Sequence, residues 1–164
     1  MKKTFLRLCA VGTLLAASSG AMAMSTLSLQ GGYGMTDSTT FEGGIAGGAV
    51  LETRFGKMLG LGVFFHYQKI APQGMFSSLT ASTMPLGAQL NFHLAPSFYI
   101  GANGGAYKIT MSGGSFTSSG YDNFVGGQAG IMFGNFGVEG RYLYSLAEGG
   151  LNIMQAFAQY RIGF

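Results

Sequence analysis

Apolar and polar residues alternate with period two along much of the chain, and the pattern is clearest in its last thirteen residues. Met154, Ala156, Ala158, Tyr160, Ile162 and Phe164 fall on one face, and Gln155, Gln159, Arg161 and Gly163 fall on the other, together with Ile153 and Phe157. Between residues 84 and 94 the apolar residues again hold the even positions and Gln89, Asn91 and His93 the odd ones. Successive side chains of a strand point to opposite faces. The pattern therefore predicts strands with one apolar and one polar face.

Applied to the whole chain, this alternation predicts eight strands. They cover residues 25–35, 41–55, 60–70, 84–94, 98–110, 124–134, 136–144 and 152–164. The connections alternate between short ones (56–59, 95–97 and 135) and longer ones (71–83 and 111–123). This spacing predicts an all-β, antiparallel up-and-down meander with tight turns at one end and loops at the other. Ten shorter strands are the alternative that the length allows.

Composition indicates where such a sheet resides. Charged residues make up 9% of the chain, against about 25% in ordinary soluble domains. No apolar run after residue 23 approaches the roughly 20 residues that a membrane-spanning helix needs. A sheet in hydrocarbon must close to leave no unpaired edge, which predicts a closed eight-stranded transmembrane β-barrel. A secreted sandwich or lipocalin-like barrel is the soluble alternative, but its outer face would need more charge than this chain carries.

Residues 1–23 have the pattern of a cleaved secretory signal peptide: basic residues, an apolar stretch and an Ala-x-Ala ending at Ala23. The barrel domain would then be residues 24–164, with six basic and six acidic residues and no cysteine. A chain without excess positive charge lacks the usual means of binding a phosphate backbone, so nucleic acid is not an expected partner.

The C-terminus carries the most specific motif. Phe164 is the last residue given, and Tyr160 and Ile162 precede it at alternate positions. With the export signal and the strand pattern, this resembles the small eight-stranded outer-membrane β-barrel proteins of Gram-negative bacteria, of the OmpA and OmpX type without a periplasmic domain. The resemblance implies a location in the outer membrane. It also implies that Tyr160, Ile162 and Phe164 form the signal read by the barrel-assembly machinery, after periplasmic chaperones have delivered the chain.

Two departures from that family have structural consequences. The chain contains no Trp, so Phe and Tyr must form the belts at the two membrane interfaces. The expected belts are Phe55, Phe98, Phe136 and Phe164 at the turn end, and Tyr33, Tyr67 and Tyr144 at the loop end. Pro85 lacks a ladder donor and is therefore expected at a strand start or a bulge.

The polar face of the predicted strands points into the barrel. The residues placed there are Gln30, Glu52, Arg54, His66, Gln68, Gln89, Asn91, His93, Asn103, Gln128, Glu139, Arg141, Gln155, Gln159 and Arg161. Buried ions need partners, and we expect Glu139 to pair with Arg161 on the last two strands. These residues predict either a structural polar plug or, as the alternative, a narrow channel for small or apolar solutes. In the channel alternative, room would be left by the inward glycines Gly44, Gly48, Gly101, Gly105, Gly126 and Gly130.

Catalytic and cofactor motifs are weak in this sequence. A lipid A-modifying enzyme is the third and most distant interpretation, but neither His66 nor His93 begins a His-x-Ser pair. The two histidines also have no Cys or carboxylate cluster at metal-ligand spacing, and Gly56-Lys57 is followed by Met58, which does not fit a phosphate loop. We therefore predict no enzyme activity, no cofactor and no metal.

Two lysines suggest a lipid partner. Lys69 and Lys108 continue the outward faces of their strands at the loop end, where a cation would lie at headgroup height and contact lipopolysaccharide phosphates. Ordinary snorkelling without a specific lipid is the alternative. In the loops, Met75, Phe76, Met111 and Phe116 would either contact a surface partner or fold over the barrel mouth.

Overall fold

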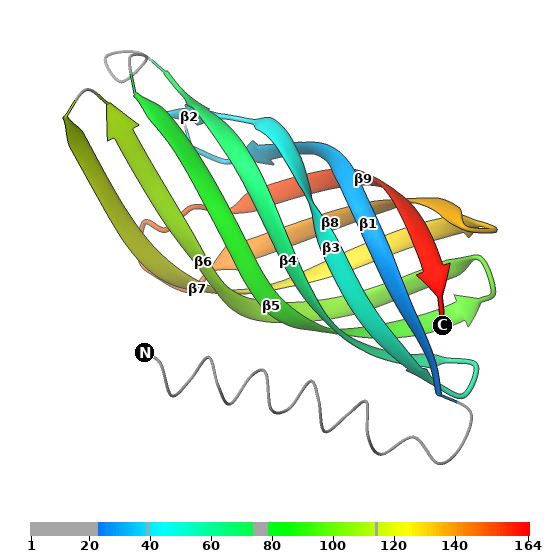
Figure 1. The fold of residues 1–164 in the computed structure, drawn as a ribbon. Helices are drawn as coiled ribbons and strands as arrows, with labels where there is room; N and C mark the ends of the chain where they lie inside the picture. The colour runs from blue at the N-terminus through cyan, green and yellow to red at the C-terminus, as the bar shows by residue number, and fades with distance from the viewer. Residues whose placement is uncertain (1–22, 39, 74–78, 114) are drawn as a thin grey trace.

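The computed structural model describes residues 23–38, 40–73, 79–113 and 115–164, and these form one antiparallel barrel (Figure 1). Its strands are β1 (Ala23–Thr36), β2 (Phe41–Glu42), β3 (Gly44–Phe55), β4 (Leu59–Pro72), β5 (Thr80–Ala95), β6 (Phe98–Gly113), β7 (Phe116–Phe133), β8 (Phe136–Ser145) and β9 (Ile153–Gly163). Among the described residues, no helix is both long and apolar enough to span a membrane.

The barrel closes where its last strand pairs with its first. β9 runs antiparallel to β1 from Thr26↔Gly163 to Thr36↔Ile153, and each of the other barrel strands pairs with the barrel strand that follows it along the chain. Strand β2 adds only two residues, which pair with the loop end of β4. Eight strands therefore make the wall. This confirms the predicted closed, up-and-down barrel of eight strands.

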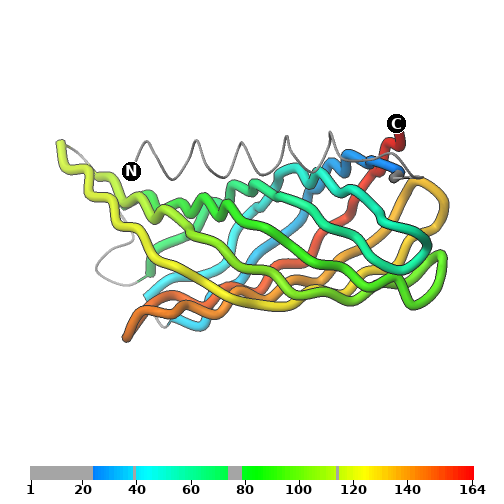
Figure 2. The backbone as a smooth tube through the Cα atoms, turned by 90° about the horizontal axis from the view of Figure 1, so that it is seen from below, coloured from blue at the N-terminus to red at the C-terminus, as the bar shows by residue number. Residues whose placement is uncertain are grey.

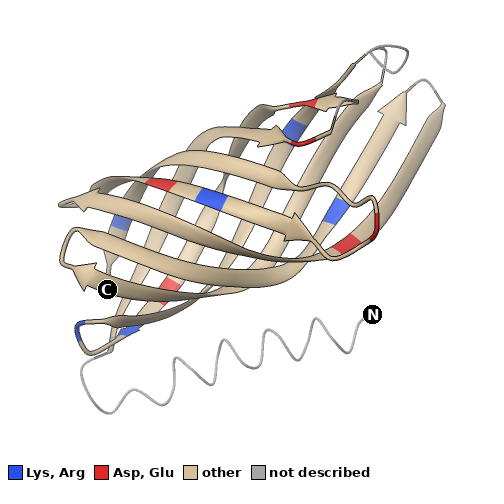
Figure 3. Cartoon of the chain, turned by 180° about the vertical axis from the view of Figure 1, so that it is seen from behind, with Lys and Arg blue, Asp and Glu red and all other residues tan. Residues whose placement is uncertain are grey.

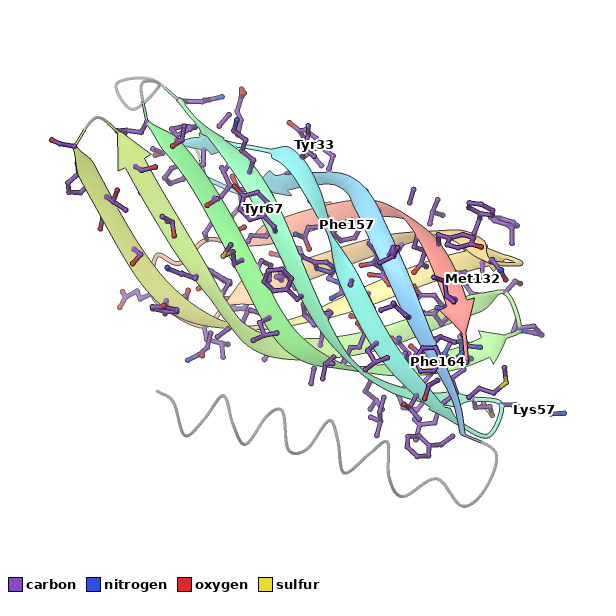
Figure 4. All side chains as sticks on the ribbon, in the orientation of Figure 1. Tyr33, Lys57, Tyr67, Met132, Phe157 and Phe164 are labelled. Atoms are coloured by element: carbon purple, nitrogen blue, oxygen red, sulfur yellow. The ribbon has the colours of Figure 1, made fainter. Side chains whose placement is uncertain are left out.

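Short turns occupy one end of the barrel. Gly56 and Gly134 adopt positive φ angles of 65° and 66° in the β3–β4 and β7–β8 turns, a conformation that favours glycine. Both ends of the described barrel lie at this turn end, because the amide of Phe164 donates to the carbonyl of Ser25 at 2.9 Å. Figure 4 shows Lys57 and Phe164 at this same end.

The β6–β7 hairpin is longer than the sequence pattern predicted. Residues 111–123 were expected to form a loop, but β6 and β7 pair continuously up to Gly113↔Phe116. The segment is rich in Ser and Gly and lacks apolar alternation, and only its single Thr, Phe and Tyr are residue types that favour strands. β7 pairs with β8 only from Phe124↔Ser145 toward the turn end. The hairpin therefore extends beyond β8, as Figures 1 and 2 show.

Pro85 lies neither at a strand start nor at a bulge, so that prediction is wrong. It sits inside β5 and is aligned with Tyr107 of β6 in an unbroken register. On its other side the β4–β5 ladder stops after Phe65↔Leu86 and resumes at Gln68↔Thr83 without a shift. The missing donor of proline is thus accommodated by a local gap in one ladder.

The two faces of the wall differ sharply in chemistry. The outer face carries exposed apolar and aromatic side chains. Figure 3 shows how few positions of the barrel are Lys, Arg, Asp or Glu. Exposed aromatics include Phe133, Phe136, Tyr160 and Phe164 at the turn end, and Tyr33, Tyr67, Tyr121 and Tyr144 toward the loop end. Phe55 and Phe98, expected in the first belt, are half-buried. The inner face is filled with buried side chains.

Candidate functional site

The fifteen polar residues assigned to the interior all point inward, and thirteen of them are buried. Arg54 and Arg161, the exceptions, are half-buried near the turn end. The fifteen residues come from all eight barrel strands, and the period-two pleat directs them to the barrel axis. The interior is therefore the first candidate site.

One polar network centres on Glu52 of β3. Its carboxylate accepts hydrogen bonds from Arg54 Nε at 3.0 Å and from the amide of Asn91, and it lies 3.1 Å from His93 Nε2. The network continues because Gln128 Nε2 donates to Asn91 Oδ1 at 2.7 Å. Asn103 donates in turn to Gln128. A buried carboxylate with several donors around it is an internal cross-link between strands.

A second polar network centres on Glu139 of β8. Arg141 Nη2 donates to its Oε1 at 2.8 Å and also to Gln89 Oε1 at 2.8 Å. The Tyr99 hydroxyl donates to the other carboxylate oxygen of Glu139, and Gln159 Nε2 donates to that hydroxyl at 2.9 Å. The guanidinium of Arg141 has no exposed surface, so its charge depends on these partners.

This second network reaches toward the loop end. Gln30 Nε2 donates to Gln159 Oε1 at 3.3 Å, and Gln30 Oε1 lies 2.6 Å from His66 Nε2. Near them, Gln155 Nε2 donates to Gln68 Oε1 at 2.9 Å. The polar side chains thus form hydrogen-bonded chains across the lumen.

The predicted pairing of Glu139 with Arg161 is wrong. In the β8–β9 ladder Glu139 lies opposite Phe157, whereas the amide of Arg161 donates to Asn135 in the turn. Arg161 is therefore two inward positions nearer the turn end. Its guanidinium lies 5.7 Å from the centre of the Tyr99 ring, with Nε 3.4 Å from Ser28 Oγ.

The inward glycines do not leave the room expected for a solute. A Cβ at Gly130 would lie 2.4 Å from the Tyr99 hydroxyl, and one at Gly101 would lie 2.1 Å from Asn91 Oδ1. At Gly48 it would meet the His66 ring at 2.3 Å. Other side chains already occupy this space, so these glycines allow close packing across the barrel.

The loop-end half of the interior is apolar, although the alternation predicted a polar lumen. Its buried cluster contains Val50, Phe64, Ile70, Ala81, Tyr107, Phe124, Leu143, Leu151 and Ile153. Leu143 and Ile153 have no exposed surface. The guanidinium of Arg141 lies 4.0 Å from the centre of the Phe64 ring and joins the two halves. The sequence nevertheless indicated this apolar region, since Tyr107, Leu143 and Ile153 occupy inward positions near the loops.

The segment 146–152 folds over this apolar half and is held by polar contacts. The Tyr107 hydroxyl lies 2.9 Å from both the Leu151 carbonyl and Asp122 Oδ2, and it accepts a hydrogen bond from the Leu151 amide at 3.2 Å. Ser145 also donates to Asp122. The Asn152 amide donates to Asp37 Oδ1 at 3.1 Å and thus ties the segment to the end of β1. We call this group of contacts the loop latch.

Asp122 lies beyond the last β7–β8 pair, at the loop end. Slight burial acts to raise its pKa, but hydrogen bonds from Ser145 and Tyr107 outweigh it and hold the pKa below the ordinary value. The carboxylate is therefore charged when the latch is formed.

The loop hydrophobics divide between the barrel mouth and solvent. Met111 packs partly buried against the apolar cluster, whereas Phe116 is exposed on the hairpin. Met75 and Phe76 lie outside the described residues.

The two histidines are engaged in structural contacts. His93 bonds to Glu52 and His66 to Gln30. Within the described ranges, no three His, Cys, Asp or Glu residues are grouped as metal ligands.

The outer wall has a groove of about 430 Å³ near the loop end. Its lining residues are Tyr33, Gly43, Gly44, Ile45, Lys69, Ile70, Ala71, Pro72, Leu79 and Thr80. Lys69 is exposed. Lys108 does not line this groove, and its Nζ lies 6.0 Å from the centre of the Tyr121 ring.

Comparisons with known proteins define the class of this fold. No family model and no curated protein matches the sequence. Among solved structures, the chain is similar to the attachment invasion locus protein Ail of Yersinia pestis in complex with the heparin analogue sucrose octasulfate. That match has 15% identity, 87% coverage of this chain, 100% of the other and a TM-score of 0.60.

Two further solved structures have the same architecture. Neisserial surface protein A matches at 13% identity, with 87% and 97% of the two chains covered and a TM-score of 0.58. The outer membrane protein OprG of Pseudomonas aeruginosa matches at 10% identity, with 84% and 96% covered and a TM-score of 0.53. The fold is therefore that of the small outer-membrane β-barrels, as the resemblance implied.

Proposed function

We propose that this chain is an integral outer-membrane barrel with a structural or surface-interaction role. It would be exported by a signal peptide, residues 1–23, which is cleaved off after Ala23. Residues 1–22 lie outside the described part of the structure, so the export step rests on sequence alone. The observation that carries the proposal is the polarity of the barrel wall, which is apolar on its outer face and polar on its inner face. Apolar side chains such as Leu29, Ile45 and Val125 are exposed outside, while Glu52 and Arg141 are buried inside, which suits a barrel surrounded by lipid.

The filled interior supports a closed barrel. The polar networks occupy the turn-end half, and the apolar cluster beneath the loop latch occupies the loop-end half. An eight-stranded barrel has an interior just wide enough for its own side chains or one small ligand. We therefore expect no continuous passage for ions.

The second candidate is a narrow channel for small or apolar solutes. The apolar cluster under Leu151 favours it, because opening the loop latch would expose an apolar site to the loop end. This candidate needs a further exit, since the buried Arg141–Glu139 ion pair lies on the turn side of the cluster.

Planar-bilayer recording tests the proposal. Purified, refolded protein should insert, shift in gel mobility on boiling, and give no conductance above background. Discrete conductance steps from heat-modifiable protein would replace the closed barrel with the channel. Protein that shows no heat modification and does not partition into vesicles would overturn the membrane location itself.

We also propose that the barrel is not an enzyme. Both histidines are held by interior partners, away from lipid outside the wall. Lipid A from cells with and without the protein should give the same mass spectrum. Loss or gain of an acyl chain would contradict this part of the proposal.

Tyr160, Ile162 and Phe164 are proposed as the recognition signal for the assembly machinery, following delivery by periplasmic chaperones. The three side chains are exposed on one outward stripe of the last strand. Phe164→Ala should lower the amount of folded protein in the outer membrane. Phe133→Ala is the matched control, because Phe133 is similarly exposed at the same end (69% against 75%) and is not part of the signal. Equal losses in both variants would indicate ordinary interface packing.

A further inference from the structure

The groove near the loop end that Lys69 lines is called the Lys69 groove here. We propose that it is a docking site for the phosphorylated headgroup and first acyl segment of lipid A, the membrane anchor of lipopolysaccharide. The inference rests on the proposed outer-membrane location and adds a defined lipid site to it.

The groove has the shape and chemistry of an amphipathic ligand site. Exposed side chains of Tyr33 on β1 and Ile45 on β3 lie on one side, and Leu79 and Thr80 lie where β5 begins. Between them, β4 contributes Lys69. The walls suit an acyl chain, and the ammonium group supplies the charge that a phosphate requires.

Gly43 helps to keep the groove open. It lies between β2 and β3 and lines the groove, and a Cβ there would lie 2.6 Å from Cε1 of Tyr33. A side chain at this position would crowd the Tyr33 side of the groove. The backbone can therefore approach a ligand closely there.

Lys69 has its charge available for such a ligand. In the described part of the chain it has no carboxylate within 4.0 Å, because all the ion pairs found there involve Glu52 or Glu139 in the interior. Glu42, exposed on β2, pairs in register with Ala71 and brings a negative charge to the rim. An anion would therefore bind beside Lys69, away from that rim.

The position of the groove along the barrel determines which leaflet of the membrane it faces. The groove lies at the loop end, opposite the short turns and Phe164. In the up-and-down outer-membrane barrels the longer loops are extracellular. The groove then faces the outer leaflet, whose anionic lipid is lipopolysaccharide, and this is why we assign lipid A rather than a phospholipid.

Native mass spectrometry of the refolded mature chain in detergent micelles tests the assignment, with added bis-phosphorylated lipid A. We expect Lys69→Gln to weaken lipid A binding by about five-fold, the effect of one cation at a membrane surface. Ala71→Phe should fill the groove and reduce binding at least as much without changing charge. The matched control is Lys57→Gln at the turn end, which should bind like the wild type. The Lys69→Gln, Lys108→Gln double variant should lose little more than Lys69→Gln alone.

Three comparisons can overturn the site. Unchanged binding in both Lys69→Gln and Ala71→Phe would remove it. An equal loss for lipid A without phosphates would remove the role of the ammonium group, and equal binding of phosphatidylglycerol would replace lipid A by a general anionic lipid. Heat-modifiable protein that fails these tests leaves the proposed membrane barrel standing. Loss of heat modification in the wild type would instead reject the barrel proposal.

Discussion

The two halves of the barrel interior are closed by different physical means. Toward the turns, Glu52 and Glu139 gather arginine, tyrosine and amide donors into hydrogen-bonded networks. Toward the loops, Leu143 and Ile153 belong to an apolar cluster covered by the segment that contains Leu151. Buried polar networks depend on every partner being present, whereas an apolar cluster depends on packing without voids. The first half is therefore sensitive to the loss of one charge, and the second to the loss of volume.

The largest expected effect is in the polar half. Glu139→Ala would leave the guanidinium of Arg141 buried without its carboxylate, which should lower the free energy of unfolding by about 3–5 kcal/mol. Urea or guanidinium unfolding of the barrel in lipid vesicles would measure it. The Glu139→Met, Arg141→Met double variant should recover most of the loss, because it removes both charges. A double variant as unstable as the single one would show that the uncompensated charge is not the cause.

The apolar half should respond to volume. Leu143→Ala creates a cavity in a fully buried cluster and should cost about 2–5 kcal/mol in the same unfolding assay. Val138→Ala, on the outward face of the same strand and 54% exposed, should cost under about 1 kcal/mol. Similar losses at both positions would mean that the inner face has no special packing.

Removing one hydroxyl from the loop latch should have a smaller effect. Tyr107→Phe loses the contacts with Leu151 and Asp122, worth about 1 kcal/mol, or about five-fold in the population of open loop. A Glu-specific protease should then cut faster after Glu148, which is exposed in the segment. Tyr121→Phe on the outer face is the control and should leave the rate unchanged. Unaltered cleavage in Tyr107→Phe would argue against a latch.

The smallest expected effect is a dependence of the latch on acid. The folded pKa of Asp122 is lowered, so its contribution is fully present above the unfolded pKa of about 4 and is lost as the pH falls through the folded pKa. Amide-exchange protection of Leu151 and Asn152 should therefore decrease at low pH. In Asp122→Asn this extra decrease should be absent. A wild-type loop with constant protection would contradict the assignment.

The pattern of alternation predicted the barrel because each strand lies between two unlike media. It also predicted which polar side chains face inward, since Gln89 and Glu139 follow from parity alone. It did not predict their partners, because strand pairing and side-chain length decide whether Glu139 reaches Arg141 or Arg161. The extended β6–β7 hairpin was missed for a related reason. Outside the membrane both of its faces meet water, so the alternation that marked the other strands disappears.

The seam between β1 and β9 determines when the barrel can close during folding. Residues from the two ends of the barrel sequence become neighbours, as in Thr26↔Gly163, so neither edge strand is satisfied until the last residues have been delivered. Contacts so distant along the chain form slowly. During that interval the incomplete sheet would expose unpaired strand edges that can pair with strands of other chains. We therefore expect the chain to aggregate readily if it is held unfolded in water before this seam has closed.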